Sequence, residues 1–422
     1  METVLTTHFA DERYRRIDGY RAAGGYEGLR KAVSMPREAI VEEVKKANLR
    51  GRGGAGFPAG VKWGFLPKDL SRPRVLVVNA DEGEPGTFKD RLILERGPHL
   101  LVEGIAITCY ALMIHRAYIY IRGEYVRETR ILDEALEEAR AAGILGKDML
   151  GTGFDLEVTL HRGAGAYICG EETSTINSLE GKRGWPRLKP PFPAVVGAFG
   201  LPTLVNNVET LADVPWIMIH GGDRFAALGC EKNGGTRLVG VSGPVVRPGV
   251  YELPANANLR SVVYDTAGGL RDGKRLKAVI PGGSSTPVLR ADEIDVTFDI
   301  ESMAKAGTMA GTCGVIVIPE GTCMVRALSV LMNFYAHESC GQCTPCREGT
   351  GWLKRITGRI EAGEGRPGDI ELILDLCENM MGRTICAMAD AAAMPARSFI
   401  EKFREEFDRH IAERKCSFGN RF

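Results

Sequence analysis

The sequence predicts an α/β protein that continues into a smaller α+β segment and ends in helices, and three observations support this fold class. From residue 37 to residue 179, helical apolar patterns alternate with short β-branched runs, as in layered α/β domains. After Gly234, short strand patterns are separated by glycine and proline turns, and from Cys323 onward the pattern is helical. At about 150 residues per domain, a chain of 422 residues holds two or three domains, which we place at 1–235, 236–322 and 323–422.

The elements of the first region follow from the spacing of its apolar residues. Residues 37–49 carry apolar side chains at positions 40, 41, 44 and 47 with charges between them, which predicts an amphipathic helix. Residues 74–78 form a β-branched run typical of a buried parallel strand. The same reasoning predicts helices over 98–114 and 126–142, strands over 117–121 and 154–160, a helix ending near 179, and an irregular, proline-rich loop over 185–202.

The later regions are predicted in the same way. Residues after Gly234 are expected to form a separate α+β unit, in which short strands surround one helix at 259–266. The region after this unit is expected to be entirely helical. The strands are predicted over 237–241, 249–253, 277–280 and 315–318, and the helices of a terminal bundle over 324–337, 349–361, 368–380 and 394–414.

Composition excludes several classes of function. Lys plus Arg and Asp plus Glu number 54 each, so no basic excess points to nucleic acid. The most apolar run, 314–332, is interrupted by Pro319, Glu320 and Arg326 and predicts no membrane span. The first ten residues lack an export signal, so we expect the 11 cysteines to be reduced and to serve as metal ligands or in packing. The 52 glycines cluster in loops, which suggests close approach to a cofactor.

A glycine-rich segment at 50–58 matches G-x-G-x-x-G at Gly51, Gly53 and Gly56. The dinucleotide fingerprint must follow a strand and open a helix, whereas here a helix precedes and Phe57-Pro58 follows. The pattern therefore predicts a flexible loop that presents backbone N–H groups and cations to a phosphate or a ring edge, with a plain surface loop as the alternative. The flanking cations are Arg50, Arg52 and Lys62.

An acidic segment, 79–86, directly follows the strand that ends at Val78. Ligands of open α/β sheets gather outside the carboxyl ends of the strands. The carboxylates of Asp81, Glu82 and Glu84 there indicate acceptors for hydroxyl or ring N–H groups and exclude a phosphate. A metal site and a solvated loop are the alternatives.

The segment 163–173 lies between a predicted strand and a predicted helix. A strand, a glycine turn and a helix in this order can place a flat ring or a phosphate against backbone N–H groups. Glu171 and Glu172 would lie at the positive end of the helix dipole. Further on, Asn206 and Asn207 are predicted to open another helix, either as an anion site or simply as capping residues.

The strongest single signal is the C-x₂-C-x₂-C pattern of Cys340, Cys343 and Cys346. Three thiolates on a tight turn converge on one soft metal centre. Zinc sites usually use separated C-x₂-C pairs, so the triple favours a 4Fe-4S cluster over zinc.

A fourth ligand must come from elsewhere. Cys377 lies on the core stripe of a predicted helix, and Cys416 lies in a basic tail that would shield a cluster poorly. Cys386 follows a helix-breaking glycine at a junction between helices, so it is our choice. We interpret Cys109, Cys230, Cys313 and Cys323 as structural, and the histidines form no pair at ligand spacing.

Five motifs in chain order make the sequence resemble the family of NADH-binding flavoprotein subunits of respiratory complex I. This resemblance implies a Rossmann-like FMN domain, a small ubiquitin-like β-grasp domain and a C-terminal four-helix bundle that carries a 4Fe-4S cluster. Ala59 departs from the family, in which a hydroxyl residue is common there, and we expect little effect. The motifs are RGRGGAGFPAGVKW (50–63), VNADEGEPGTFKDR (78–91), GAGAYICGEETSTINSLEG (163–181), RLKPPFPAVVGAFGLPTLVNNVET (187–210) and SCGQCTPCREGT (339–350).

The resemblance also implies roles for individual residues. It implies that Cys340, Cys343, Cys346 and Cys386 ligate the cluster. The implied NADH site comprises Phe57, Phe65, Glu84, Glu172, Lys189 and Phe192, with Glu84 and Glu172 closest to the chemistry. The implied FMN site comprises Gly51, Gly53, Gly54, Lys62, Asn79, Asp81, Tyr167, Gly170, Glu171, Asn206, Asn207 and Thr210.

The implied activity is transfer of hydride from NADH to FMN and of single electrons onward to the cluster, toward quinone. The implied partners are a thioredoxin-like 2Fe-2S subunit and a large multi-cluster iron–sulfur subunit, in an assembly on the cytoplasmic face of the inner membrane. One rival is the flavin subunit of a soluble NAD-linked hydrogenase or formate dehydrogenase. A second rival is a non-catalytic scaffold in which the cysteines bind zinc.

Overall fold

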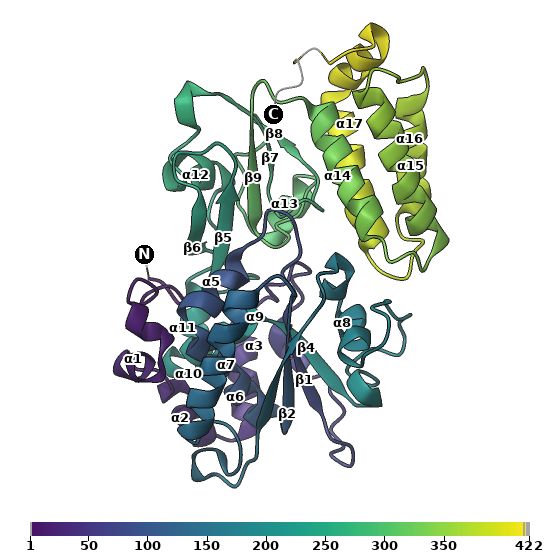
Figure 1. Cartoon of the computed structure of the whole chain (residues 1–422). Coiled ribbons are helices and arrows are strands. Elements are labelled where there is room, and N and C mark those ends of the chain that lie inside the picture. The colour runs from purple at the N-terminus through teal and green to yellow at the C-terminus, as the bar shows by residue number, and fades with distance from the viewer. Residues whose placement is uncertain (1, 417, 419–422) are drawn as a thin grey trace.

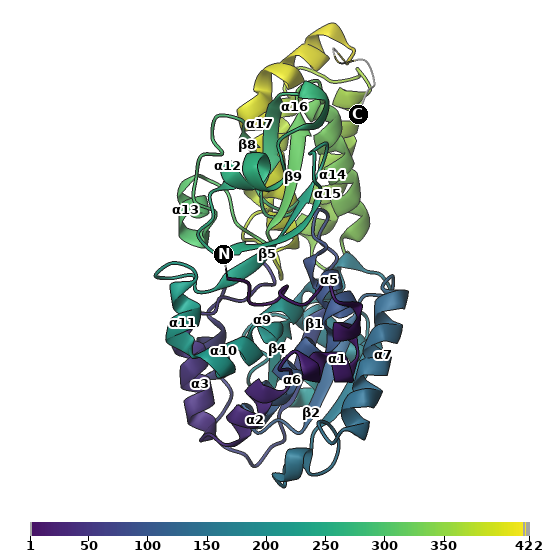
Figure 2. The same cartoon turned by 90° about the vertical axis from the view of Figure 1, so that its left-hand side faces the viewer.

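The computed structural model describes residues 2–416 and 418 and has three parts (Figure 1). A four-stranded sheet with its helices forms the lower part of Figure 1, and a five-stranded sheet lies above it. The C-terminal helices stand beside the second sheet, and together these upper parts extend the molecule along one axis (Figure 2). The predicted mixed α/β class is confirmed.

The first sheet is parallel throughout, with the strand order β3-β2-β1-β4. Its central strand β1 aligns Val78 with Asn206 and Asn79 with Asn207 on β4. Because all the strands run the same way, their carboxyl ends meet at one edge, where ligands bind in such sheets. The strands are β1 (Val75–Ala80), β2 (Arg116–Ile121), β3 (Glu157–Arg162) and β4 (Thr203–Asn207).

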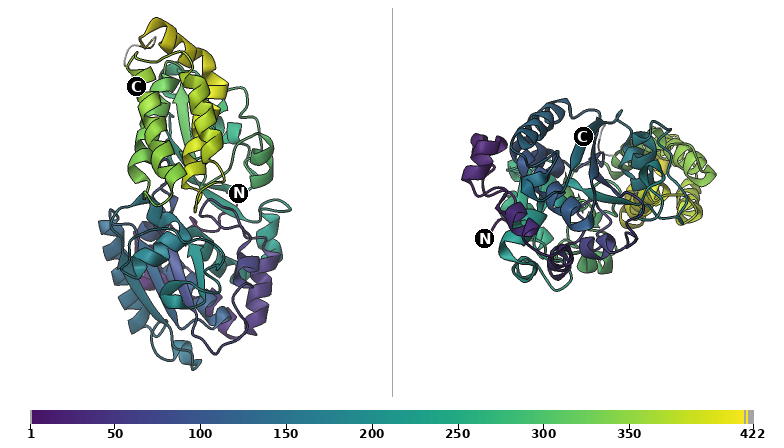
Figure 3. Two further views of the ribbon diagram at one scale, coloured as in Figure 1. Left: turned by 90° about the vertical axis from the view of Figure 1, so that its right-hand side faces the viewer. Right: turned by 90° about the horizontal axis from the view of Figure 1, so that it is seen from below.

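Helices cover both faces of this sheet, as the view from below shows (Figure 3). Alternate residues of β1 enter different cores: Leu76 and Val78 join the large core of the first region, whereas Val75 and Val77 join a second cluster. The 3-10 turns of this region are η1 (Glu12–Arg15), η2 (Met149–Gly151), η3 (Tyr167–Gly170) and η4 (Ala198–Gly200). The helices are α1 (Ile17–Ala22), α2 (Glu27–Val33), α3 (Arg37–Lys46), α4 (Ala59–Trp63), α5 (Lys89–Arg96), α6 (Pro98–Leu112), α7 (Val126–Ala141), α8 (Glu172–Leu179), α9 (Val208–Ala212), α10 (Val214–His220) and α11 (Gly222–Ala227).

One prediction in this region is wrong. Asn206 does not open a helix but lies inside strand β4, and only Asn207 acts as a cap, by accepting a hydrogen bond from the Glu209 N–H at the start of α9. The strand is short and ends in two asparagines, which β-sheets disfavour, so its sequence gives little signal. Pairing with β1 decides its structure.

The second sheet is mixed, with the order β6-β5-β9-β7-β8; β5 and β9 are parallel and the other neighbours antiparallel. The predicted helix at 259–266 is a short α-helix followed by a π turn. Strand β8 was not predicted, because two residues show no alternation. The elements are β5 (Thr236–Ser242), β6 (Gly249–Pro254), α12 (Leu259–Ser261), η5 (Val262–Thr266), η6 (Arg271–Gly273), β7 (Leu276–Ile280), β8 (Leu289–Arg290), α13 (Ile300–Lys305) and β9 (Gly314–Pro319).

The C-terminal helices pack side by side, α14 against α15 and α17, and α16 against α15 and α17 (Figure 3). Their apolar residues, including Leu328, Leu353 and Phe399, belong to the same buried cluster as Val75 and Val77 of β1. Among the described residues, no helix combines the length and apolar character needed to cross a membrane. The helices are α14 (Met324–Glu338), α15 (Thr344–Glu361), α16 (Asp369–Met380) and α17 (Met388–Glu413).

Two of these helices begin earlier than predicted. Helix α15 begins at Thr344 instead of residue 349, since Cys343 takes the N-cap position and Pro345 fits the first turn. Helix α17 begins at Met388 instead of residue 394 and contains Pro395. The cysteine triple therefore runs from a turn into a helix rather than lying wholly on a turn.

Candidate functional site

The glycine loop between α3 and α4 crosses the carboxyl edge of the first sheet. The Gly51 N–H donates to the Phe57 carbonyl at 2.9 Å, and the Arg52 N–H donates to the Thr210 hydroxyl at 2.8 Å. A Cβ on Gly53 would lie 3.3 Å from the Cβ of Asn207. The structure thus brings the predicted residues Gly51, Gly53, Asn207 and Thr210 together.

The arginines beside this loop already have partners within the chain, which the expected role as phosphate-binding cations did not anticipate. Arg50 forms an ion pair with Glu301 at 2.8 Å. Arg52 is only 6% exposed, and its guanidinium donates to the carbonyls of Gly234 and Thr236. Burial of a guanidinium requires such partners, which lie in segments far along the chain.

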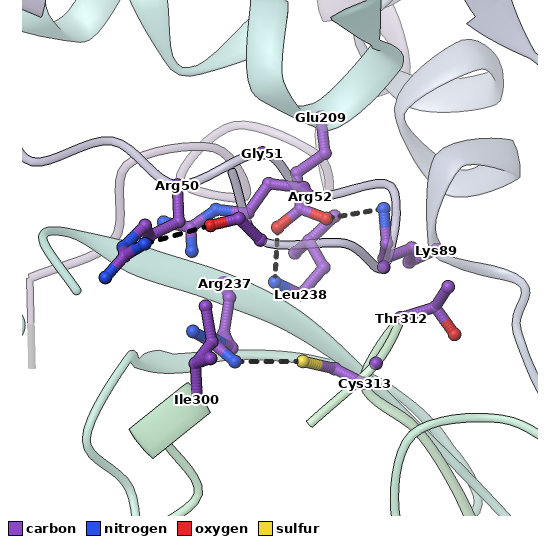
Figure 4. Close-up of a pocket in the computed structure, with 13 residues that line it drawn as sticks. Arg50, Gly51, Arg52, Lys89, Glu209, Arg237, Leu238, Ile300, Thr312 and Cys313 are labelled. Carbon is purple, nitrogen blue, oxygen red and sulfur yellow. Dashed lines mark hydrogen bonds and ion pairs between the residues drawn. The ribbon is translucent and has the colours of Figure 1, made fainter. Parts of the chain in front are cut away.

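A small cavity lies beneath the loop (Figure 4). Its volume is about 20 Å³, and Glu209 crosses it to accept the Leu238 N–H at 2.8 Å and to pair with Lys89 at 2.7 Å. On the other side Arg237 donates to the Cys313 sulfur at 3.3 Å. A cavity of this size holds about one water molecule, so it is too small for a cofactor.

The end of β1 carries a second group of predicted residues. The Asn79 amide donates to the Gly170 carbonyl at 2.8 Å, and its oxygen accepts the Asp81 N–H at 3.0 Å. Burial raises the pKa of Asp81 to about 7, although the Arg122 guanidinium opposes the shift. A Cβ on Gly170 would lie 3.2 Å from the Asp81 carbonyl, so the glycine permits this close approach.

Glu84 connects this edge to the second sheet. Its carboxylate accepts the Tyr167 hydroxyl at 2.6 Å and the Ser285 N–H at 2.7 Å. Burial, and then the Glu84 charge, raise the pKa of Tyr167 well above its usual range. Glu84 therefore already has partners within the chain.

The start of helix α8 concentrates charge. Glu171 caps the helix by accepting the N–H groups of Thr173 and Ser174. Glu172 pairs with Lys62 at 3.1 Å and with Lys189 at 2.7 Å. Burial opposes ionisation of Glu172, but the two lysines outweigh it and hold its pKa below the ordinary value.

The predicted aromatic residues lie at the exposed rim. The rings of Phe57 and Phe65 are 5.7 Å apart, and the two side chains are 45% and 55% exposed. Phe192 is 57% exposed on the proline-rich loop, and the ring pairs seen among the described residues do not include it. Asn206, by contrast, faces inward and accepts the Trp63 indole N–H at 3.1 Å.

The cysteine triple lies where α14 ends and α15 begins. Cys340 and Cys343 are half-buried, and Cys346 is buried in the first turn of α15. Burial raises the pKa of Cys346 to about 11; the Ser339 hydroxyl opposes the shift, and Cys343 and Cys340 add to it. The three sulfurs therefore lie within electrostatic range of one another.

Of the candidates for a fourth ligand, Cys386 interacts electrostatically with cysteines of the triple. Burial raises the pKa of Cys386 to about 12, and Glu171, Cys346 and Cys340 add to the shift. Cys377 is buried inside α16, where burial raises its pKa to about 12 and the flanking charges belong to Arg397 and Glu401.

The second site abuts the first. The Tyr167 N–H donates to Glu338 at 3.0 Å, and the Trp185 indole N–H donates to the Cys340 carbonyl at 3.2 Å. The Tyr167 ring also lies 5.2 Å from that of Phe334 on α14. One layer of side chains thus joins the edge of the first sheet to the cysteine turn.

A third group, which the sequence patterns did not predict, is formed by Cys323, His410 and Cys416. Their ligand atoms all lie within 4.8 Å of one another. Cys323 and His410 are separated by 87 positions in the chain, so no local spacing could reveal the group. Only the packing of α14 against α17 brings it together.

Comparison with known proteins defines the class. Residues 44–216 match the Nuo51 FMN-binding domain, and residues 326–410 match the NADH-ubiquinone oxidoreductase-F iron–sulfur binding region. Residues 238–289 match the SLBB domain. The chain is therefore a flavoprotein of the kind that combines an FMN domain with an iron–sulfur region.

Relatives identify the family. The NADH-quinone oxidoreductase F subunit 2 of Rhizobium meliloti (strain 1021) is 53% identical over 95% of this chain and 96% of its own length. The F subunit of the NADH-quinone oxidoreductase of Escherichia coli (strain K12) is 50% identical over 94% of this chain and 90% of its own length. The chain belongs to the family of NADH-quinone oxidoreductase F subunits.

A solved structure agrees with the fold. The crystal structure of an NAD+-reducing [NiFe]-hydrogenase in the air-oxidized state has a TM-score of 0.82 and 36% identity. The match covers 90% of this chain but 64% of the hydrogenase chain. The likeness therefore concerns part of that longer polypeptide.

Proposed function

We propose that this chain oxidises NADH at the edge of its first sheet and passes the electrons, one at a time, to its C-terminal helices. FMN, when bound, exchanges two electrons with NADH and one at a time with a 4Fe-4S cluster, which carries a single electron. The observation that carries the proposal is the contact between the two sites through Tyr167 and Glu338 and through Trp185 and Cys340.

The outer face of the glycine loop fits a flavin. Gly53 is exposed, and a Cβ there would occupy the space above Asn207, while Gly170 permits the backbone to approach Asp81. The residues that would hold FMN are Gly51, Gly53, Gly54, Lys62, Asn79, Asp81, Tyr167, Gly170, Glu171, Asn206, Asn207 and Thr210. Their part is to bind and orient the ring, since hydride transfer requires alignment but no protein acid or base.

The exposed rim fits the nucleotide. The Phe57 and Phe65 rings offer apolar faces to an adenine, with Phe192 on the loop opposite in this proposal. Glu172 would accept ribose hydroxyls, and Lys189 would hold it in place. Glu84, already bonded to Tyr167, would line the inner end of this site.

The cysteines fit a 4Fe-4S cluster. Cys340, Cys343, Cys346 and Cys386 supply a soft, all-sulfur donor set, and the partly buried turn limits solvent. The N-terminal end of α15 also places backbone N–H groups near the thiolates, which would stabilise their charge.

We further propose domains at 1–235, 236–322 and 323–422. The mixed second sheet with its short helix supports a ubiquitin-like β-grasp domain, and α14–α17 support a four-helix bundle. The relatives are named as subunits of NADH-quinone oxidoreductase, so we propose that the chain works in that assembly. Its neighbours there would be the thioredoxin-like 2Fe-2S and the multi-cluster iron–sulfur subunits, on the cytoplasmic face of the inner membrane.

A second candidate is the flavin subunit of an NAD-linked hydrogenase, which the structural likeness favours. The longer hydrogenase chain and the higher identity to the quinone oxidoreductase relatives favour the first candidate. Subunits that co-purify from the native cell distinguish the two.

The test is a measurement of cofactors and activity on the purified chain. We expect FMN to be bound noncovalently, so that acid precipitation releases it into the supernatant. We also expect NADH to reduce ferricyanide at a rate proportional to the flavin content. FAD in the supernatant, flavin that stays in the pellet, or a colourless zinc protein would contradict the proposal.

A further inference from the structure

A second set of metal-binding side chains lies away from the proposed cluster site. Cys323 is the N-cap of α14, directly after the second sheet, and His410 lies in the last turns of α17. Cys416 follows the end of α17 and is half-buried, whereas Cys323 and His410 are buried. The Cys323 sulfur is 3.4 Å from His410 Nε2, and all three ligand atoms lie within 4.8 Å of one another.

Hydrogen bonds orient two of these side chains toward a common point. His410 Nδ1 lies 2.8 Å from the Glu406 carbonyl oxygen, which can only accept, so Nδ1 carries the proton. Nε2 therefore presents its lone pair toward Cys323. Metal-bound histidines are held in this way, by a bond from the other ring nitrogen to a carbonyl or a carboxylate. The Arg326 N–H in turn donates to the Cys323 sulfur at 3.4 Å.

The charges around the group favour a divalent cation. Two cysteine thiolates balance the two charges of such an ion, so the buried centre would be neutral overall. The nearby Glu406 carboxylate has other partners, because it accepts the Met324 N–H at 3.0 Å and pairs with Lys277. Lys277 in turn lies over the Phe418 ring, at 4.5 Å from its centre. Glu406 and Lys277 are therefore paired with each other, and neither charge competes with an ion bound by Cys323, His410 and Cys416.

We propose that Cys323, His410 and Cys416 bind one zinc ion or a similar borderline divalent cation. Two sulfurs and one imidazole nitrogen are three of the four ligands of a tetrahedral zinc site, and a water molecule would supply the fourth. Binding releases two thiol protons to solvent and changes no oxidation state. The ion joins the start of α14 to the end of α17, beside the second sheet.

The test uses the full-length protein, purified under reducing conditions, incubated with Zn²⁺ and freed of excess by gel filtration. Metal analysis should give about one zinc per chain, in addition to the iron of the cluster. Zinc X-ray absorption should show two sulfurs at about 2.3 Å and nitrogen or oxygen at about 2.0 Å, not four sulfurs. Cys323→Ala and Cys416→Ala should each lose the zinc while retaining iron and FMN.

Matched controls separate the site from general thiol chemistry. Cys377→Ala removes a buried thiol of the same helical region, and Cys230→Ala removes a half-buried one elsewhere; both should keep the zinc. Because Cys323 is buried, its variant can fail to fold, but Cys416 lies after the last helix, where truncation disturbs little.

Three outcomes overturn the proposal. The first is zinc that remains at wild-type level in Cys416→Ala, and the second is zinc bound only to four sulfurs, which points to the cluster cysteines. The third is a wild-type chain that binds no zinc, whether its thiols are free or its mass is two hydrogens lower because Cys323 and Cys416 form a disulfide. A chelator that lowers the melting temperature of the wild type but not of Cys416→Ala would support the proposal.

Discussion

The edge of the first sheet and the cysteine turn of the C-terminal helices are built in opposite ways. The edge joins loops that follow different strands, and its close contacts include backbone and amide groups, such as the Asn79 bond to Gly170. The cysteine turn holds three sulfurs within one short segment, and we propose that a fourth comes from Cys386 at the junction before α17. The first site should therefore fail when a side chain is added, and the second when a sulfur is removed.

The largest effect should come from replacing Cys386, the proposed cluster ligand that lies outside the cysteine turn. We expect Cys386→Ser to abolish or alter the EPR signal of the reduced cluster and to slow electron transfer to the next subunit by on the order of 100-fold or more. FMN content and NADH–ferricyanide activity should stay unchanged, because the residues that we propose to hold the flavin all lie before residue 211. EPR, flavin content and steady-state rates check this expectation.

Cys377→Ser is the control for that experiment. Its thiol is buried inside α16, so the hydroxyl should cost about 1–3 kcal/mol of stability but leave the EPR signal intact. If the two variants behave the other way round, our assignment of the fourth ligand is wrong.

The reciprocal change is Gly53→Val. A Cβ there would lie 3.3 Å from Asn207 Cβ, and the branched methyl groups would fill the face on which we place the flavin. Overpacking costs about 1–3 kcal/mol, so FMN should bind roughly 5- to 150-fold more weakly, as measured by flavin fluorescence titration. Dithionite should still produce the cluster EPR signal.

Gly351→Ala is the matched change on the cluster side. Gly351 lies inside α15 with open space around its Cβ position, so alanine should add up to about 1 kcal/mol of stability and disturb neither cofactor.

Unchanged flavin affinity in the Gly53→Val variant would argue against the outer face of the glycine loop as the flavin site.

Charge at the rim should have a smaller effect, on the choice of nucleotide. Glu172 would repel the 2′-phosphate of NADPH, but Lys62 and Lys189 offset part of its charge. We therefore expect Glu172→Gln to lower the NADH to NADPH ratio of kcat/KM by about 10-fold. Glu180→Gln, which changes a carboxylate at the other end of α8, should leave the ratio unchanged.

The last effect concerns pH and the stability of the protein, not its electron transfer. Burial raises the pKa of Asp81 to about 7, so the folded state holds its proton more tightly than the unfolded state. This contribution to stability is complete below the ordinary aspartate value and is lost as the pH rises through about 7. In flavin-free protein, the free energy of unfolding should therefore fall between pH 5 and pH 8, by about 2–3 kcal/mol more in the wild type than in Asp81→Asn. Parallel urea titrations of the two proteins check this; equal slopes would show that Asp81 keeps an ordinary pKa.

Local pattern determined much of the fold. The amphipathic repeat of 37–49 became α3, the β-branched run at 74–78 became most of β1, and the Gly382 break separated α16 from α17. These features depend on neighbours within a few residues, so the sequence contains their cause. The order of the motifs likewise sufficed to indicate the family, which the relatives confirm.

The sequence alone could not assign partners to side chains. Arg50 and Arg52 beside a glycine loop suggested phosphate binding, yet their partners are Glu301 and the carbonyls of Gly234 and Thr236. Strand β4 formed against its local propensity because β1 offered a parallel neighbour. The grouping of Cys323 with His410 and Cys416 arises only where the ends of α14 and α17 meet. Each of these outcomes depends on segments separated by about a hundred residues or more, and their proximity is a property of packing, which local periodicity and spacing do not contain.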